Sequence, residues 1–198
     1  MIVAVVVLLV LAGVAGILAG RAGTDGRAGL IRAAAPLVFL AAAAVVALAA
    51  PAASGFGLAT VRVAAVLAAM AGGSVLVTAT FVLAGANGRE QEEPTEAPAS
   101  VAGSAAASPE EAVEETDAEV VEEPLRGGLA IGILERAAIA VCILANFAAG
   151  LAVIVAAKGL ARYPELRNPG AAEQFIIGTF VSVLWAAGCA GVAVAVGR

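Results

Sequence analysis

The sequence predicts an all-α, polytopic integral membrane protein with about five transmembrane helices, three before and two after a disordered acidic linker. Three observations support this fold class. Of the 198 residues, 62% are hydrophobic and 14% are charged, whereas soluble domains are about 45 to 50% apolar. Five stretches are apolar over about 20 residues, the length that a helix needs to cross a bilayer. Residues 85–128, in contrast, are acidic and contain few large apolar side chains.

The five apolar stretches are predicted to be helices, because hydrocarbon offers no water to pair with backbone amides and carbonyls. They cover Ile2–Gly20, Ala33–Ala53, Val63–Ala84, Ala137–Ala157 and Phe175–Val196. The first stretch has the position of a secretory signal, but it lacks a basic n-region. Its apolar run of about 19 residues also exceeds the roughly 7 to 15 of such a signal. We therefore expect it to be retained as a span.

The linker separates a three-span region, residues 1–84, from a two-span hairpin with a charged connecting loop, residues 129–198. Residues 85–128 hold twelve acidic residues against Arg89 and Arg126, so their net charge is −10 and the rest of the chain carries +5. A segment rich in Glu, Ala, Ser and Pro cannot bury enough apolar surface to offset the entropy lost on ordering. We therefore predict that it is disordered.

Basic residues near span ends set the orientation of a membrane protein. If the N-terminus is outside, seven of them lie on the cytoplasmic side and four outside. The cytoplasmic set is Arg21, Arg27, Arg32, Arg89, Arg126, Arg136 and Arg198, and the outer set is Arg62, Lys158, Arg162 and Arg167. This favours an outer N-terminus and a cytoplasmic linker, although it concentrates three outer basic residues in one connection. The excess of Arg over Lys, in a chain dominated by Ala, Gly and Val, is typical of a GC-rich bacterial genome. Together with the apolar spans, it leads us to expect a multi-pass protein of the bacterial plasma membrane.

Glu135 and Arg136 stand side by side where the fourth span begins. One interpretation places them at headgroup depth, with the Arg136 side chain extending to the interface. The alternative starts the helix near Leu129, so that Glu135 and Asn146 share one polar face while Arg136 and Lys158 lie at opposite ends of one side. Asn146 lies in mid-span, where its amide needs a partner, so we expect a hydrogen bond between helices rather than part of a solute path.

The fifth span carries a stripe of small residues and one indole. Gly178, Ser182, Trp185 and Cys189 follow at spacings of four, three and four, which places them on one helix face. Trp185 lies near the middle of the span rather than in an interfacial belt. We therefore expect this face to pack against the fourth span.

The connection between the last two spans has more charge than a simple turn requires. Lys158, Arg162, Glu165, Arg167 and Glu173 fall within 16 residues. One interpretation is a solvated connector that lies along the headgroups. The other is a docking surface for anionic lipid or a protein partner, since each basic residue near an anionic leaflet contributes about 1 kcal/mol.

Residues 134–185 carry three motifs: an L-E-R entry, an A-A-K-x-hydrophobic-x-R exit and an A-E-Y-hydrophobic-I-G-T re-entry. They fall on Glu135 and Arg136, on Lys158 and Arg162, and on Glu173, Gly178 and Thr179, with Gln174 in place of the tyrosine. In these motifs the segment resembles the C-terminal two-helix part of an uncharacterised, domain-of-unknown-function family of bacterial multi-pass membrane proteins. The resemblance implies a recurring hairpin module and brings no activity with it.

The composition argues against several function classes. The chain has no histidine and shows no Gly-rich phosphate loop, metal-ligand pattern or activated nucleophile. We therefore predict no enzymatic activity and no cofactor or metal, and the lack of a basic domain with interleaved aromatics argues against nucleic-acid binding.

Two functions remain as predictions. The first is a structural or accessory component in the lipid bilayer that contacts a protein partner through the acidic linker or the helix faces, or a second copy of itself in a homo-oligomer. The second is a small oligomeric transporter or channel in which Glu135, Asn146 and Lys158 line a hydrophilic route.

Overall fold

The computed structural model describes residues 1–23, 26–85 and 128–198, and these residues form helices joined by short connections. The predicted all-α, polytopic fold is thus confirmed. Four helices are long and apolar enough to cross a membrane: α1 (Ile2–Ala22), α2 (Gly26–Ala49), α3 (Gly55–Ala84) and α6 (Pro169–Val196). The predicted disordered linker falls outside the described residues, apart from Gly85 and Gly128 at its ends.

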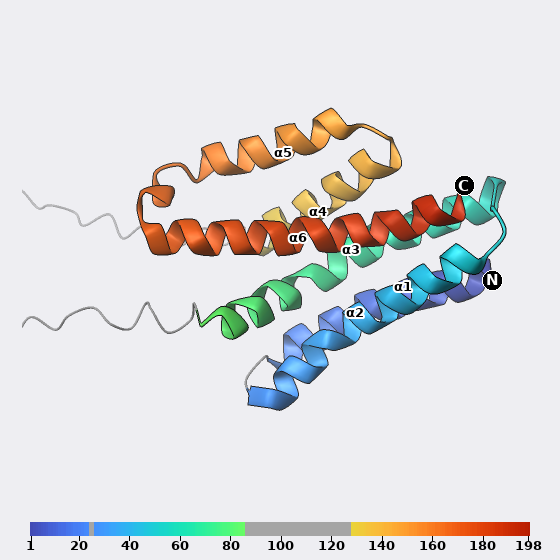
Figure 1. Cartoon of the computed structure of the whole chain (residues 1–198), viewed down its shortest axis with the longest axis horizontal. Helices are drawn as coiled ribbons and strands as arrows, with labels where there is room; N and C mark the ends of the chain where they lie inside the picture. The colour runs from blue at the N-terminus through green and yellow to red at the C-terminus, as the bar shows by residue number, and fades with distance from the viewer. Residues whose placement is uncertain (24–25, 86–127) are drawn as a thin grey trace, which may run out of the picture.

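The four long helices run along a common axis, and their connections alternate between the two ends of the bundle (Figure 1). Both termini and the α2–α3 connection lie at one end. The backbone N–H of Ala53 donates to the carbonyl of Val196 over 2.8 Å, which joins this connection to the end of α6. The end of α1, the start of α2, the end of α3 and the α5–α6 connection lie at the other end (Figure 1).

Three of the long helices begin before the apolar stretch that predicts them. Helices α2, α3 and α6 start at Gly26, Gly55 and Pro169, because backbone hydrogen bonding continues where side chains reach the interface. The start of α6 has a local cause, since the Asn168 side chain accepts a hydrogen bond from the Gly170 N–H over 2.9 Å. Asn at the N-cap followed by Pro is a strong helix-start signal.

The fourth predicted span, Ala137–Ala157, is not a single helix, and that prediction is wrong. The segment forms two helices, α4 (Gly128–Leu144) and α5 (Ala148–Ala161). Asn146 has a φ of 54°, its N–H donates to the Ile143 carbonyl over 3.0 Å, and the Phe147 N–H donates to the Cys142 carbonyl over 2.8 Å. This bond pair is a Schellman motif with Asn in the left-handed position, where it is the usual substitute for Gly.

The turn at Asn146 folds α5 back along α4, so that the segment enters and leaves at the same end of the bundle (Figure 1). The Lys158 Nζ lies 2.5 Å from the Glu135 Oε2, which joins the last turns of α5 to α4. Helix α5 has 14 residues and is therefore about 21 Å long, shorter than a full span. We call α4 and α5 the re-entrant hairpin.

A left-handed turn at Asn146 and a continuous helix through Asn146 predict opposite orders of stability for the Gly and Ala variants. In the left-handed turn, Asn146→Gly should retain or slightly raise the free energy of unfolding, while Asn146→Ala should lower it by about 1 kcal/mol. In a continuous helix the order is reversed, because Ala is about 1 kcal/mol better than Gly. Reversible unfolding of both variants in mixed detergent micelles would measure the difference, and greater stability of the Ala variant would contradict the turn.

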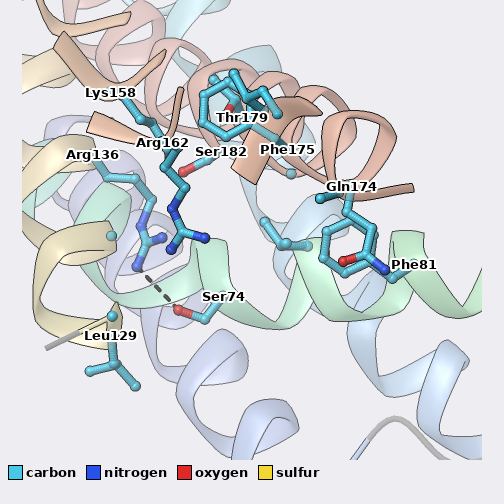
Figure 2. Close-up of a pocket in the computed structure, with 16 residues that line it drawn as sticks. Ser74, Phe81, Leu129, Arg136, Lys158, Arg162, Gln174, Phe175, Thr179 and Ser182 are labelled. Carbon is cyan, nitrogen blue, oxygen red and sulfur yellow. Dashed lines mark hydrogen bonds between the residues drawn. The ribbon is translucent and has the colours of Figure 1, made fainter. Parts of the chain in front are cut away.

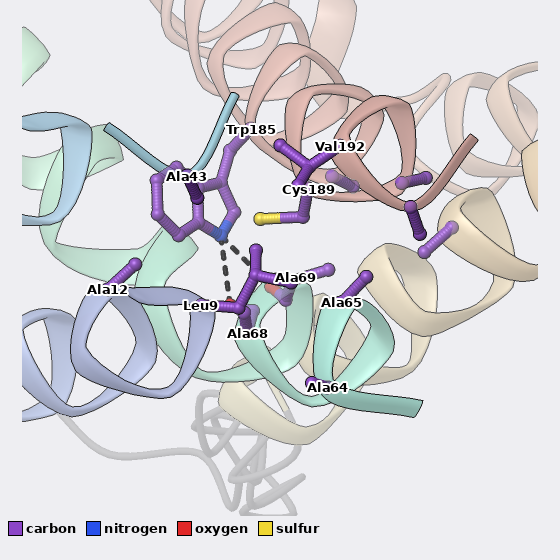
Figure 3. Packing of buried hydrophobic residues seen from close by; sticks show 14 of the residues in the cluster. Leu9, Ala12, Ala43, Ala64, Ala65, Ala68, Ala69, Trp185, Cys189 and Val192 are labelled. Atoms are coloured by element: carbon purple, nitrogen blue, oxygen red, sulfur yellow. Dashed lines mark hydrogen bonds between the residues drawn. The ribbon is translucent and has the colours of Figure 1, made fainter. Parts of the chain in front are cut away.

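The core of the bundle is built from small residues. Of the buried apolar side chains, most are Ala and Val, with Leu9, Leu76, Ile139 and Trp185 as the larger members. Small side chains let helix backbones approach closely, which matters in lipid because burial of apolar surface gives little driving force there. Figure 3 shows how the α1, α3 and α6 side chains meet around Trp185.

Candidate functional site

Two adjacent glycines on α3, Gly72 and Gly73, form the point where three other helices meet α3. Helix α1 approaches through Gly16, where an added Cβ would lie 3.2 Å from the Gly72 carbonyl carbon. Helix α6 approaches Gly72 through Trp185, and α4 approaches Gly73 through Arg136. We call Gly72 and Gly73 the glycine crossing.

Trp185 is 2% exposed, and its indole N–H is shared between the Ala68 and Ala69 carbonyls of α3, each at 3.2 Å (Figure 3). The absence of a side chain at Gly72 makes the space, since a Cβ there would lie 2.9 Å from the indole Cε2. The expectation that Trp185 packs inside the protein is therefore confirmed. Its hydrogen-bonding partner was not predicted, because the indole N–H donates to α3, while α6 also packs against α4.

Arg136 is 3% exposed, and its guanidinium crosses from α4 to α3. Its Nε donates to the Ala69 carbonyl, and its Nη2 donates to the Met70 carbonyl and to the Ser74 Oγ, all over 3.1 Å. A Cβ at Gly73 would lie 2.7 Å from Nε, so glycine is needed for this contact. The interpretation that Arg136 extends to the interface is wrong, because its charge is satisfied inside the bundle.

Glu135, which precedes Arg136 on α4, pairs with Lys158 of α5. Both side chains are partly buried, at 16% and 24% exposure. The sequence predicts Lys158 and the Glu135–Arg136 pair at opposite ends of one helix. This prediction is wrong, because the turn at Asn146 brings Lys158 back beside Glu135. The ion pair fixes the register of the hairpin, with one partner on each arm.

A cavity of about 530 Å³ lies between α3, α4 and α6 and is closed on one side by the end of α5 (Figure 2). Its charged lining side chains are Arg136, Lys158 and Arg162, and among the described side chains no carboxylate lines it. Polar groups come from Ser74, Gln174, Thr179 and Ser182. Apolar walls come from Val77, Phe81, Leu129, Leu166 and Phe175. We call this the cationic cavity.

Helix α6 supplies the far wall of the cationic cavity. Gly178 lets α6 approach α3, since a Cβ there would lie 3.1 Å from the Phe81 ring. Thr179 is 9% exposed, and its Oγ1 has no hydrogen-bond partner within the described part of the chain. Ser182 is also buried beside it. The small-residue stripe of the sequence is thus a real helix face, and it meets α3.

Two predicted site residues lie elsewhere. Asn146 is exposed at the turn between α4 and α5, so it neither joins helices nor lines either cavity that the structure shows. Glu173 is exposed on the first turns of α6 and is not among the residues that line the cationic cavity. The interpretation of Asn146 as a mid-span hydrogen-bonding residue is therefore wrong, since it caps a helix.

Sequence reasoning missed the partner surface on α3. Gly72 adjoins Trp185, Gly73 adjoins Arg136, and the Ser74 Oγ accepts a hydrogen bond from Arg136. Nothing in this stretch of α3 is charged. The available signal is the glycine pair in "AGGS", because two successive glycines weaken an exposed helix and are useful where other helices must approach closely.

The fold and the cavity together define a class: a polytopic helical membrane protein with a re-entrant hairpin that is held by buried charged side chains. Across residues 1–23, 26–85 and 128–198, no group of three or more His, Cys, Asp or Glu side chains is placed to hold a metal ion. Comparisons with protein-family models, curated proteins and solved structures found no match to this chain.

Proposed function

We propose that the protein is a non-catalytic structural or accessory component of a bacterial plasma membrane. The main support is that its buried and partly buried polar side chains bond to other parts of the bundle. Arg136 and Trp185 hold α4 and α6 to α3, and Glu135 and Lys158 hold the hairpin together. These groups stabilise a helix arrangement, as expected of a scaffold that presents other surfaces to partners.

The orientation we propose places the hairpin end in the cytoplasm. The described basic residues near this end are Arg21, Arg27, Arg32, Lys158, Arg162 and Arg167. Only Arg62 and Arg198, among the described residues, lie near the other end. Under the positive-inside rule, this asymmetry supports an outer N-terminus, an outer C-terminus and a cytoplasmic acidic linker.

The family resemblance fits the same proposal. Its entry and exit motifs fall on Glu135, Arg136 and Lys158, which are the residues that fasten the hairpin. We infer that the resemblance reflects a recurring way of packing and not a reaction centre. The partner is then reached by the acidic linker, by the lipid-facing helix surfaces or by a second copy of the chain.

A small oligomeric transporter is a second candidate, and the cationic cavity is the observation that favours it. Its residue set differs from the predicted one, because Glu135 is engaged with Lys158 and Asn146 lies at the turn. Flux of a small anion into proteoliposomes tests this candidate directly. Flux that is abolished by Arg162→Gln would support transport over the scaffold.

The scaffold proposal is tested by changing the linker alone. Cross-linking in intact cells, followed by purification, should recover the same partners with the full chain in every repeat. Deletion of residues 90–123 should remove a partner that the linker recruits, and a linker of equal length with Glu changed to Gln should do the same if charge is recognised. An unchanged partner set in both variants would contradict recruitment by the linker.

A further inference from the structure

The charged side chains that line the cationic cavity already have partners within the protein. The Arg136 guanidinium donates three hydrogen bonds to α3, and the Lys158 ammonium pairs with Glu135. Arg162 also interacts within the chain. A charge that is paired attracts a further ion only weakly, because the field of its partner opposes its own. These groups therefore do not require an anionic ligand.

Two hydroxyl groups on one face of α6, in contrast, have no partner. Ser182 is 5% exposed and Thr179 is 9% exposed, both line the cavity, and neither hydroxyl forms a hydrogen bond with any described residue. The threonines of α3 differ, since Thr60, Thr78 and Thr80 each donate to the carbonyl four residues earlier, over 2.9, 3.2 and 2.7 Å. A buried hydroxyl without a partner costs free energy, so the α6 pair is suited to an acceptor that a ligand supplies.

The other walls of the cavity are largely apolar and partly aromatic. Val77, Phe81, Leu129 and Phe175 line it. Figure 2 shows Phe175 on the α6 wall with the two hydroxyl residues, and Phe81 across from them on α3. The volume of about 530 Å³ lies within the range of about 300 to 1,000 Å³ for small-molecule pockets, which combine apolar walls with a few polar groups. Since α3 and α6 are long and apolar enough to cross a membrane, a ligand between them is expected to be lipid-soluble.

We propose that the cationic cavity binds a neutral, lipid-soluble molecule through a carbonyl oxygen. The Ser182 and Thr179 hydroxyl groups donate to that oxygen, and the rings of Phe81 and Phe175 contact the apolar body of the ligand. A carbonyl oxygen has two lone pairs, which matches two donors three residues apart on one helix face. Two kinds of membrane molecule offer this chemistry, the ring of an isoprenoid quinone and the acyl ester of a glycerolipid. The site goes beyond the scaffold proposal and does not depend on the linker.

Native mass spectrometry of the full chain in detergent tests the proposal with three probes: a decyl-substituted benzoquinone, a diester phosphatidylcholine and the diether analogue of that lipid, which has no carbonyl group. The quinone or the diester lipid should remain bound at concentrations where the diether lipid dissociates. Retention of the quinone identifies the first source, and retention of the diester lipid identifies the second. Thr179→Val and Ser182→Ala should each weaken binding of the retained probe about three- to tenfold, the range for one neutral hydrogen bond.

Thr80→Val is the matched control, because the Thr80 hydroxyl bonds to its own helix and Thr80 lines neither of the two cavities described. It should bind the retained probe as tightly as the unchanged protein does. Without any probe, Thr179→Val should unfold at the same or a higher temperature than the unchanged protein, since it removes a buried hydroxyl that has no partner. Equal retention of all three probes, retention of none, or equal binding by Thr179→Val, Ser182→Ala and Thr80→Val would overturn the site.

Discussion

Replacing Gly72 with alanine is expected to destabilise the protein by about 2 to 3 kcal/mol, which is the cost of overpacking a close contact together with a lost aromatic anchor. The new Cβ would occupy the position of the Trp185 ring, 2.9 Å from its Cε2. The indole must then withdraw from α3 and lose both hydrogen bonds to the Ala68 and Ala69 carbonyls. Gly73→Ala should act similarly through Arg136, whose Nε lies 2.7 Å from the new Cβ.

The same exchange at Gly191 provides the control. Gly191 lies on α6, and a Cβ added there meets nothing within 4 Å. Alanine is the better helix former, so Gly191→Ala should leave the free energy of unfolding unchanged or raise it by up to about 1 kcal/mol. Reversible unfolding in mixed micelles, followed by Trp185 fluorescence and by circular dichroism, measures both variants. Equal stability of Gly72→Ala and Gly191→Ala would show that α6 does not rest on the glycine crossing.

The largest qualitative effect is expected in the topology of the last connection. In the re-entrant arrangement, Tyr163→Cys should be labelled by a membrane-impermeant maleimide from the same side as Ala22→Cys, and from the side opposite to Ala52→Cys. The reason is the turn at Asn146, which returns α5 to the end where α1 finishes (Figure 1). A continuous fourth span would instead place Tyr163 on the side of Ala52.

These labelling variants are made after Cys142 and Cys189 have been replaced by alanine, so that each chain holds one thiol. Cys189 is fully buried and Cys142 is partly buried, and neither forms a disulfide. Tyr163 is 60% exposed, and Ala22 and Ala52 are exposed, so all three positions are accessible to reagent. Labelling of Tyr163→Cys and Ala52→Cys from one shared side would contradict the re-entrant hairpin.

Some features of the site could be predicted from local sequence alone. Trp185 could be assigned to the interior, because a mid-span indole needs a hydrogen-bond acceptor away from lipid. Helix periodicity could place the stripe from Gly178 to Cys189 on one face. The partner could not be predicted, since periodicity describes one helix and carries no information about which neighbour that face meets.

Asn146 shows where local reasoning was ambiguous. A polar residue in an apolar run fits a mid-span hydrogen bond, and it fits equally well the left-handed position that ends a helix. The apolar stretch from Ala137 to Ala157 has the length of one span, which favoured the first interpretation. The proposed orientation of the N-terminus and the linker is unchanged, but Lys158, Arg162 and Arg167 now lie at the end that holds Arg21, Arg27 and Arg32.

The sequence by itself determined the helical, membrane-spanning class, since apolar runs of bilayer length cannot satisfy their backbone groups in any other way. It also determined the positions of the first three spans and the face of the last helix, although α2 and α3 begin seven and eight residues earlier than predicted. Only the tertiary structure decided that α4 and α5 form a re-entrant hairpin and that Arg136 and Trp185 meet at the glycine crossing on α3. The physical reason is that these contacts join segments more than 60 residues apart in the sequence. They form because Gly72 and Gly73 of α3 have no side chain, which leaves room for Trp185 of α6 and Arg136 of α4.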